Sequence, residues 1–262
     1  MSDTRIVFDD GDVYERTMGA WSRPAGEIFL DWLAPAPGLR WIDVGCGNGA
    51  FTEVLMRRCA PAEVQGIDPS EGQLAFARAR PGAERATFLQ GDAQALPFEA
   101  GRFDAAVMAL VIFFVPEPAK GVAEMARVVR PGGLVSSYAW DFPGGGFPYR
   151  PVQEALRALG RTPAFPPSVE ASRMDNLRAL WAGAGLEAVE TREITVERRF
   201  ADFDAFWAQC VITASLRAAL DRMAPEELAR LREETRARLR VDGTGGIVHT
   251  GRANAIRGRV PG

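Results

Sequence analysis

A glycine-rich turn that follows a short apolar run constrains the fold of this chain more than any other feature. The run Trp41–Val44 contains Asp43 near its end and breaks into Gly45-Cys46-Gly47-Asn48-Gly49, here called the glycine turn, after which the sequence becomes helix-like. Glycines at these positions let backbone N–H groups approach an anion at the start of the next helix, where unpaired donors and the helix dipole favour negative charge. The segment therefore predicts a strand, a ligand-binding turn and a helix in succession.

Acidic residues follow the next two expected strands as well. The second strand, 63–67, ends in Asp68, and the third, 86–90, leads into Gly91 and Asp92. The carboxyl ends of parallel strands meet at one edge of an open α/β sheet, where such folds bind ligands, so we expect these carboxylates to face one crevice. The glycine turn alone also fits the permissive G-x-G-x-x-G/A spacing of dinucleotide-binding proteins, which leaves a nicotinamide-dependent oxidoreductase as an alternative.

Apolar runs and helix-like segments alternate through the middle of the chain, which predicts right-handed crossovers and a parallel sheet. The strands expected there are 40–44, 63–67, 86–90, 104–110 and 133–139. The helices expected between them are 49–59, 71–80 and 118–129. Towards the C-terminus we expect strands at 186–198 and about 246–257, and helices around 151–159, near 173–183 and within 201–240.

Taken in order from about Tyr14 to Gly133, these segments resemble those of class I S-adenosylmethionine (SAM) dependent methyltransferases, in the broad group that includes the quinone-biosynthesis C-methyltransferases. The turn Arg130-Pro131-Gly132-Gly133 matches the same pattern. The resemblance implies a Rossmann-like α/β fold with a doubly wound, seven-stranded, mostly parallel sheet whose last strand is antiparallel. It also implies transfer of a methyl group from SAM to an oxygen, nitrogen or carbon atom of a small organic molecule, with S-adenosylhomocysteine (SAH) as the product.

The resemblance also implies which residues bind SAM. The glycine turn approaches the methionine part and Asp43 orders it. Asp68 accepts hydrogen bonds from both ribose hydroxyls, and Asp92 with Ala93 contacts the adenine. An ionised carboxylate offers two acceptor oxygens to the paired donors of a ribose, which supports the role of Asp68. The expected cofactor-binding residues are, in full, Tyr14, Trp21, Arg23, Asp43, Gly45, Cys46, Gly47, Asp68, Pro69, Gln73, Asp92, Ala93 and Ala109.

The segment from Tyr14 to Arg23 resembles the lid helix of small-molecule methyltransferases. In that arrangement Tyr14 and Trp21 cover the cofactor, and the guanidinium of Arg23 pairs with the SAM carboxylate. An amphipathic helix whose aromatic residues only seal the core is the alternative. Gln73 departs from the methionine that many relatives have against the adenine, although an amide there is able to hydrogen-bond the ribose.

No general base stands out in the sequence. Methyl transfer from a sulfonium needs alignment of the acceptor and exclusion of water more than a protein nucleophile, so no catalytic triad is expected. Where relatives often have a histidine after the fourth strand, this chain has Ile112-Phe113-Phe114, which predicts either an apolar substrate wall or core packing. The weak candidates for a base are His249, Tyr14, Tyr149 and Asp141.

Composition narrows the function classes. The formal net charge of -3 argues against a dedicated nucleic-acid binder, and the Asn/Asp-Pro-Pro-Tyr/Phe motif of amino-group methylation is absent. The three cysteines lack metal-like spacing, so no metal site is expected. The longest apolar run, 105–115, is too short to span a bilayer and no secretion signal is visible, which predicts a cytoplasmic protein without a membrane partner. Abundant arginine and alanine beside a single lysine indicate a bacterial source, and we expect a monomer or homodimer.

We expect four segments along the chain. Residues 1–38 form an N-terminal helical lid, and 39–140 form the SAM-binding Rossmann-like core. Residues 141–185 form a cap insertion, and 186–262 supply the last two strands with a helical insertion over 201–240. A non-catalytic SAM-binding protein is a third hypothesis, because no base is evident. The residues expected to line an acceptor pocket include Phe113, Phe142, Phe147, Tyr149 and Trp207.

Overall fold

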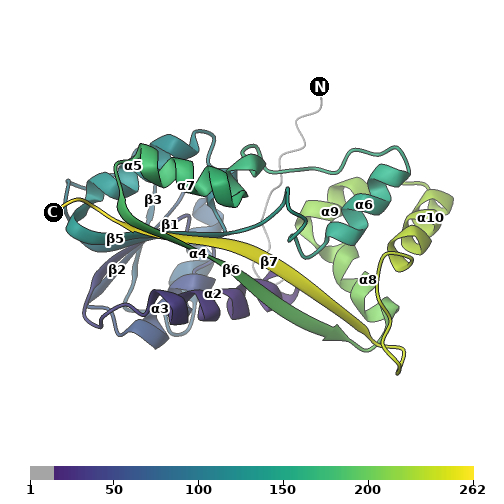
Figure 1. Cartoon of the computed structure of the whole chain (residues 1–262). Helices are drawn as coiled ribbons and strands as arrows, with labels where there is room; N and C mark the ends of the chain where they lie inside the picture. The colour runs from purple at the N-terminus through teal and green to yellow at the C-terminus, as the bar shows by residue number, and fades with distance from the viewer. Residues whose placement is uncertain (1–14) are drawn as a thin grey trace.

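The computed structural model describes residues 15–262, and the side chains of residues 15, 16, 214, 215 and 218 are not among those described. Figure 1 shows a layered α/β core and a group of helices at the far end of a long strand pair. The strand pair belongs to the sheet of the core. The two parts are therefore joined through continuous β-structure.

The core is built on a seven-stranded sheet with the order β3-β2-β1-β4-β5-β7-β6. The strands are β1 (Arg40–Val44), β2 (Glu63–Asp68), β3 (Thr87–Gln90), β4 (Phe103–Ala109), β5 (Val129–Trp140), β6 (Glu187–Phe200) and β7 (Ile247–Arg259). Neighbours among β1 to β5 pair in parallel, whereas β7 runs antiparallel to both β5 and β6. The strand order reverses between β1 and β4, and open α/β sheets bind ligands at such a point. The expected Rossmann-like architecture with an antiparallel last strand is confirmed.

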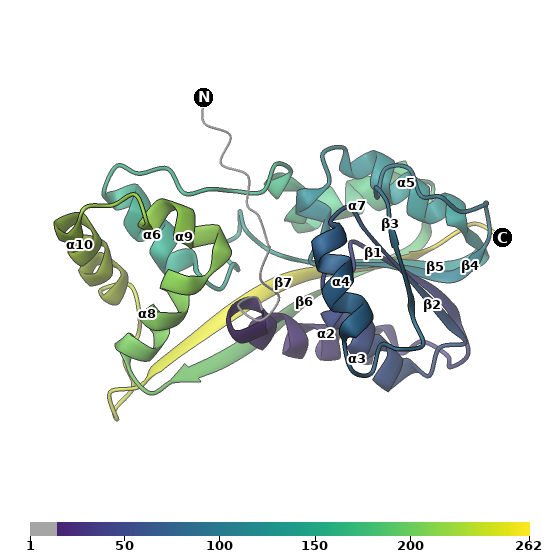
Figure 2. The same ribbon diagram turned by 180° about the vertical axis from the view of Figure 1, so that it is seen from behind.

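Helices cover both faces of the sheet, as Figures 1 and 2 show. The helices on one face are α2 (Ala20–Leu33) and α3 (Ala50–Cys59), and those on the other are α5 (Pro118–Val128) and α7 (Met174–Gly183). A further helix, α4 (Glu71–Ala79), packs against β2 and β3. Because both faces are covered, β1 and β4 are almost entirely buried, which explains why they are short apolar runs in the sequence.

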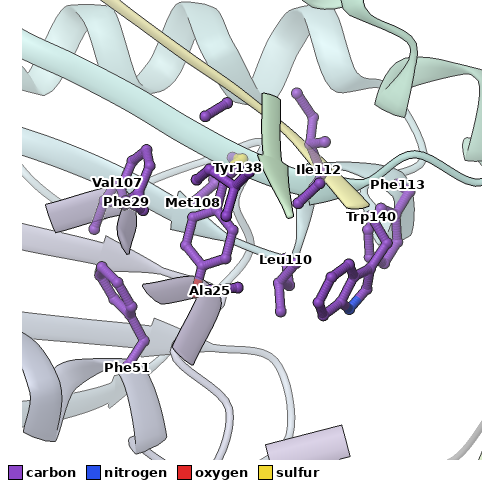
Figure 3. Packing of buried hydrophobic residues seen from close by; sticks show 14 of the residues in the cluster. Ala25, Phe29, Phe51, Val107, Met108, Leu110, Ile112, Phe113, Tyr138 and Trp140 are labelled. Carbon is purple, nitrogen blue, oxygen red and sulfur yellow. The ribbon is translucent and has the colours of Figure 1, made fainter. Parts of the chain in front are cut away.

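An aromatic cluster fastens α2 to the sheet. Phe29 of α2 has its ring centroid 4.6 Å from that of Tyr138 on β5, and Phe51 of α3 lies 5.8 Å from the same ring (Figure 3). Gly26 suits this contact, because a Cβ there would lie 3.0 Å from the Tyr138 hydroxyl. The cluster therefore fixes where the first turns of α2 lie over the sheet.

The helical group at the end of the strand pair is called the cap below. It consists of α6 (Arg150–Ala158), α8 (Phe203–Ile212), α9 (Ala214–Leu220) and α10 (Pro225–Arg236). Figure 1 shows it where β6 and β7 project beyond the other strands. The cap combines helices from both expected insertions, and α6 packs against α10. Within residues 15–262 no helix is long and apolar enough to cross a membrane.

Helix α7 lies within residues 141–185 but does not join the cap. Trp181 is fully buried, and its indole Nε1 donates to the Val135 carbonyl oxygen of β5 at 3.1 Å. The helix also packs against α5, β6 and β7. The expected insertion 141–185 thus contains one cap helix and one core helix. Three short helical turns complete the elements of the described residues: η1 (Glu15–Gly19), η2 (Ile112–Phe114) and η3 (Val169–Ser172).

Candidate functional site

A cavity of about 870 Å³ lies at the carboxyl ends of the central strands. Its wall includes the glycine turn after β1, Asp68 at the end of β2, Asp92 after β3 and Ala109 at the end of β4. The first turns of α2 and the segment 165–167 complete the wall. The cavity thus occupies the crevice that the positions of the carboxylates predicted.

Most of the expected cofactor-binding residues come together at this cavity. Those that line it are Arg23, Asp43, Gly45, Cys46, Gly47, Asp68, Pro69, Gln73, Asp92, Ala93 and Ala109. Trp21 instead is fully buried beside Phe200 and His249, and Tyr14 lies outside the described residues. In the described part of the chain, no group of three or more His, Cys, Asp or Glu side chains is placed to hold a metal ion.

The glycine turn has a backbone that favours glycine. Gly45, Gly47 and Gly49 have φ angles of 77°, 52° and 77°, in the left-handed region that residues with a Cβ disfavour. A Cβ on Gly45 would also lie 2.4 Å from Val111 Cγ1. The backbone N–H groups of Gly45 and of the next residue donate to the Ile67 carbonyl oxygen at 2.7 and 3.0 Å. These two hydrogen bonds tie the turn to β2.

Two backbone donors fix the carboxylate of Asp68. Its Oδ2 accepts from the Gly47 N–H at 3.0 Å, and its Oδ1 accepts from the Ser70 N–H at 2.9 Å. Burial raises the pKa of the Asp68 carboxyl, and the two N–H donors oppose that shift. An ionised carboxylate has about four lone-pair sites. Asp68 therefore has capacity to accept two further hydrogen bonds from a ligand with neighbouring hydroxyls.

Asp43 is a fully buried carboxyl in the cavity wall. Its Oδ2 accepts from Thr52 Oγ1 at 2.7 Å, whereas its Oδ1 has no hydrogen-bond partner among residues 15–262. Burial raises the pKa of the Asp43 carboxyl to about 7, with the Thr52 hydrogen bond lowering it and the Asp68 charge raising it. A buried acceptor without a donor is costly. The free oxygen is therefore suited to a cationic or donor group of a ligand.

Arg23 reaches the cavity wall but is paired within the protein. Its guanidinium donates to both carboxylate oxygens of Glu53 on α3, at 3.1 and 3.2 Å. Arg80 also donates to Glu53, at 3.1 Å. A ligand carboxylate, the partner expected for Arg23, would have to compete with Glu53. The two residues are 30 positions apart, so no local pattern in the sequence indicates this pair.

Two of the candidate bases, Asp141 and Tyr149, lie outside the cavity wall. Asp141 Oδ1 accepts from the Gly144 N–H at 2.9 Å, and its Oδ2 accepts from Arg252 Nη2 at 2.6 Å. Tyr149 is fully buried, and burial raises the pKa of its phenol to about 12. The phenol is therefore protonated near neutral pH, and Asp141 is engaged in closing a loop.

His249, the third described candidate base, also lies outside the wall, on β7 between two aromatic rings. Its ring centroid is 5.8 Å from that of Trp21 and 5.7 Å from that of Phe206. Its Nε2 lies 2.8 Å from the Pro148 carbonyl oxygen, so we assign the proton of the neutral ring to Nε2, which donates this bond. Burial lowers the pKa of the imidazole, and the hydrogen bond opposes the shift. His249 is thus a packed residue where the cap meets the core.

The cavity has lining residues that the sequence did not single out. Tyr138 reaches it from β5 and Ser22 from α2, while Phe165 closes it together with the two prolines that follow. The position of Tyr138 near the end of an expected strand is a signal that could have found it. The segment 165–167 is only an irregular connection in the sequence, and nothing in its pattern places it beside the glycine turn.

Four of the aromatic residues expected in an acceptor pocket form a connected set, here called the aromatic series. Neighbouring ring centroids lie 5.1, 4.4 and 5.9 Å apart along the series Phe113, Phe142, Phe147 and Tyr149. Phe113 also contacts Phe114, which lines the cavity, so the Ile112–Phe114 segment supplies both wall and core packing. The fifth expected residue, Trp207, instead stacks against Phe203 within the cap.

The chain is similar in sequence and fold to known methyltransferases. Residues 42–137 match the family model described as a methyltransferase domain. The chain is 34% identical to demethylmenaquinone methyltransferase of Renibacterium salmoninarum over 158 residues, which are 58% of this chain and 64% of that protein. It is 40% identical over 128 residues, 47% of this chain and 36% of the relative, to 2-methyl-6-phytyl-1,4-hydroquinone methyltransferase 2, chloroplastic, of Oryza sativa subsp. japonica. The chain thus covers less than two thirds of the length of these curated relatives.

The fold is similar to that of Haemonchus contortus phosphoethanolamine N-methyltransferase 2, solved in complex with SAM. The TM-score is 0.58 at 17% sequence identity, over 97% of this chain and 58% of that chain. At this identity the similarity concerns the fold. Residues 42–137 are therefore similar to the methyltransferase domain, and the chain has a Rossmann-like fold similar to that of this neighbour.

Proposed function

We propose that this chain transfers a methyl group from SAM to a small organic molecule. The observation that supports this most is the cavity, whose wall combines the glycine turn with three carboxylates, all within the segment that matches the methyltransferase domain. The relatives reported above are named as methyltransferases that act on a demethylmenaquinone and a phytyl hydroquinone. We do not transfer those acceptors to this chain, because the cap lies outside the matched segment.

The cavity wall fits the chemical groups of SAM. The unpartnered Oδ1 of Asp43 is suited to an ammonium, which the methionine part of SAM provides. The remaining lone pairs of Asp68 are suited to the two ribose hydroxyls. Gly47 also lines the wall, and a Cβ there would have only Gln73 Oε1 within 4 Å, at 3.9 Å, so the backbone at Gly47 is open to close approach by a ligand. When bound, SAM supplies a methyl group on a sulfonium that is already activated for in-line displacement.

The residues of the chain then orient the reactants and exclude water. Phe114, Val111 and Phe165 give the cavity an apolar wall, and Ser22 and Gly26 contribute the α2 side. Holding two reactants in line removes much of the entropic barrier of a bimolecular step. An apolar wall also keeps water from competing with the acceptor. This chemistry requires no protein nucleophile.

The two alternatives use the same cavity. A nicotinamide-dependent oxidoreductase would use the glycine turn but gives no role to Asp92, which lines the cavity and accepts from the Gln94 N–H at 2.8 Å. It also does not account for the match to the methyltransferase domain. A non-catalytic SAM-binding protein would use the whole wall without turnover. Titration with SAH and NAD, and an assay for SAH formation, distinguish both alternatives from the proposed function.

We further propose a bacterial, cytoplasmic protein that acts on a small molecule, without nucleic acid, as a monomer or homodimer. The single lysine among 31 basic residues supports a bacterial source with a GC-rich genome. The three cysteines are buried and free, which suits a reducing compartment. The formal net charge of -3 supports a small-molecule substrate over a nucleic acid.

The test is calorimetric titration with SAH of the wild-type protein, Asp68→Ala and Asp175→Ala. Asp175 is the control because its side chain is 85% exposed on α7. We expect Asp68→Ala to weaken SAH affinity about 10- to 100-fold, about 1–3 kcal/mol, because ribose hydroxyls lose their acceptor. Asp175→Ala should bind like the wild type. Absence of SAH binding by the wild type, or its displacement by NAD, would refute the proposal. Failure to form SAH from SAM with a broad panel of small acceptors would instead indicate a non-catalytic binder.

A further inference from the structure

The junction between the core and the cap contains a half-buried arginine, Arg198 of β6. Side chains alternate along a strand, and Arg198 shares the inward face with Val196 and Phe200, which are 4% and 6% exposed. On the outward face, Glu197 and Arg199 pair with each other at 3.0 Å. Arg198 is therefore a cation at a position where its strand otherwise buries apolar side chains.

Two aromatic rings flank the guanidinium of Arg198. It lies 5.2 Å from the ring centroid of Trp21 and 4.8 Å from that of Phe200. Its Nη1 donates to Gln209 Oε1 of α8 at 2.8 Å, and no carboxylate among the described residues pairs with it. Burial lowers the pKa of the guanidinium, and the nearby Tyr149 opposes that shift. Most of its N–H donors therefore face no protein acceptor.

Two more donors lie at the junction. The Trp21 indole N–H and the Tyr149 hydroxyl are fully buried, and neither makes a hydrogen bond of normal geometry within residues 15–262. The polar groups that face the Tyr149 hydroxyl are the Thr213 hydroxyl, the Trp21 indole and the Arg198 cation. A buried donor without an acceptor is costly. The Arg198 cation and two neutral donors thus lie together at the junction, and donors of this kind suit an anionic oxygen group.

A series of packed aromatic rings links the junction to the cavity wall. Phe114 in the cavity wall contacts the first ring of the aromatic series, and the series ends at Tyr149. The ring centroid of Tyr149 lies 6.4 Å from that of Phe206, which in turn lies 5.2 Å from that of Phe200 beside Arg198. Packed rings therefore connect the surroundings of Arg198 with the cavity wall.

We propose that Arg198 binds a carboxylate group of the acceptor molecule, with Tyr149 and Trp21 as neutral donors beside it. A planar guanidinium donates two parallel hydrogen bonds to a carboxylate, and one unpaired cation suits one negative charge. His249, directly opposite Arg198 on β7, is a packed imidazole that donates away from the site to a backbone carbonyl. That the bound carboxylate belongs to the methyl acceptor rests on the proposed function. The anion site itself is testable without turnover.

The experiment compares carboxylates with their primary amides. Wild-type protein, Arg198→Met and Arg199→Met are titrated calorimetrically, in the presence of SAH, with cinnamate, cinnamamide, decanoate and decanamide. Arg199 is the matched control because it is the next residue, on the opposite face of the strand, with a side chain 71% exposed. We expect the wild type and Arg199→Met to bind at least one carboxylate about tenfold or more tightly than its amide. Arg198→Met should bind both forms alike.

Equal affinity of the wild type for carboxylates and amides, or no binding of either carboxylate, would overturn the proposal, as would a preference that survives in Arg198→Met. If Arg198→Met does not fold, Arg198→Lys keeps the charge but loses the planar fork, and the carboxylate preference must fall. Titration with SAH separates the two proposals. SAH binding without carboxylate preference overturns the anion site alone, and carboxylate preference without SAH binding overturns the proposed function alone.

Discussion

Replacing Gly45 with alanine measures how strictly the glycine turn excludes a side chain. Gly45 has a φ angle of 77°, and a Cβ there would lie 2.4 Å from Val111 Cγ1 and 2.6 Å from Cγ2. The left-handed backbone costs an alanine about 1–2 kcal/mol, and forcing an extra atom into packed space costs about 1–3 kcal/mol more. We therefore expect Gly45→Ala to lower the free energy of unfolding by about 2–5 kcal/mol, measured by equilibrium urea denaturation.

Gly38 provides a matched control for the backbone part of this loss. Its φ angle is 78°, and a Cβ there would meet no atom within 4 Å. Gly38→Ala should therefore lower the free energy of unfolding by only about 1–2 kcal/mol. In a Val111→Ala background, which removes both γ carbons but leaves the Val111 Cβ at 3.0 Å, Gly45→Ala should cost less than in the wild-type background, and a double-mutant cycle measures the difference. Equal losses for Gly45→Ala and Gly38→Ala in the wild-type background would refute the steric reasoning.

Two carboxyls should affect the pH dependence of stability with opposite signs. Hydrogen bonds from Arg40 and Arg130 hold the pKa of Asp104 well below its usual range. Its contribution is present above the ordinary aspartate pKa of about 3.9 and is lost as pH falls. Asp104→Asn should thus be less stable than wild type at neutral pH, and urea midpoints of the two proteins should converge in acid. Burial raises the pKa of Asp43 to about 7, so its contribution is full below about pH 4 and is lost as pH rises through about 7. Asp43→Asn should show a flatter dependence of the urea midpoint on pH over that window, and an unchanged slope would contradict the assignment.

The core could be predicted from the sequence because its signals are local. The expected strands 40–44 and 63–67 differ from β1 and β2 by at most one residue. The first is almost entirely buried, whereas the second alternates partly buried residues, Glu63 and Gln65, with buried ones. The glycine turn and the carboxylates at Asp68 and Asp92 lie within a few residues of strand ends. Topology alone then brings them to one cavity.

The placement of α7 and of several site side chains depends on contacts between residues far apart in the chain. Trp181 donates to a carbonyl 46 residues earlier, which places α7 on the sheet rather than in the cap. Arg23 pairs with Glu53, and His249 donates to a carbonyl 101 residues earlier. An amphipathic pattern indicates that a helix has a buried face but not which surface buries it. The sequence therefore indicates Arg23, His249 and a helix near 173–183 without placing their side chains.

The methyltransferase domain model matches only one segment of the chain. This explains why the relatives indicate the proposed methyl transfer better than they indicate the acceptor molecule. The matched segment 42–137 contains the glycine turn and the cavity carboxylates, whereas Tyr149, Arg198 and His249 all lie outside it. The strands β7 and β6 join the sheet beyond β5, on the opposite side of β1 from β2 and β3. Changes at the junction can therefore alter which molecule is held without moving the turn, because fold and substrate are set by different residues. The carboxylate site proposed for Arg198 is an example, and it directs the search for the acceptor towards organic acids.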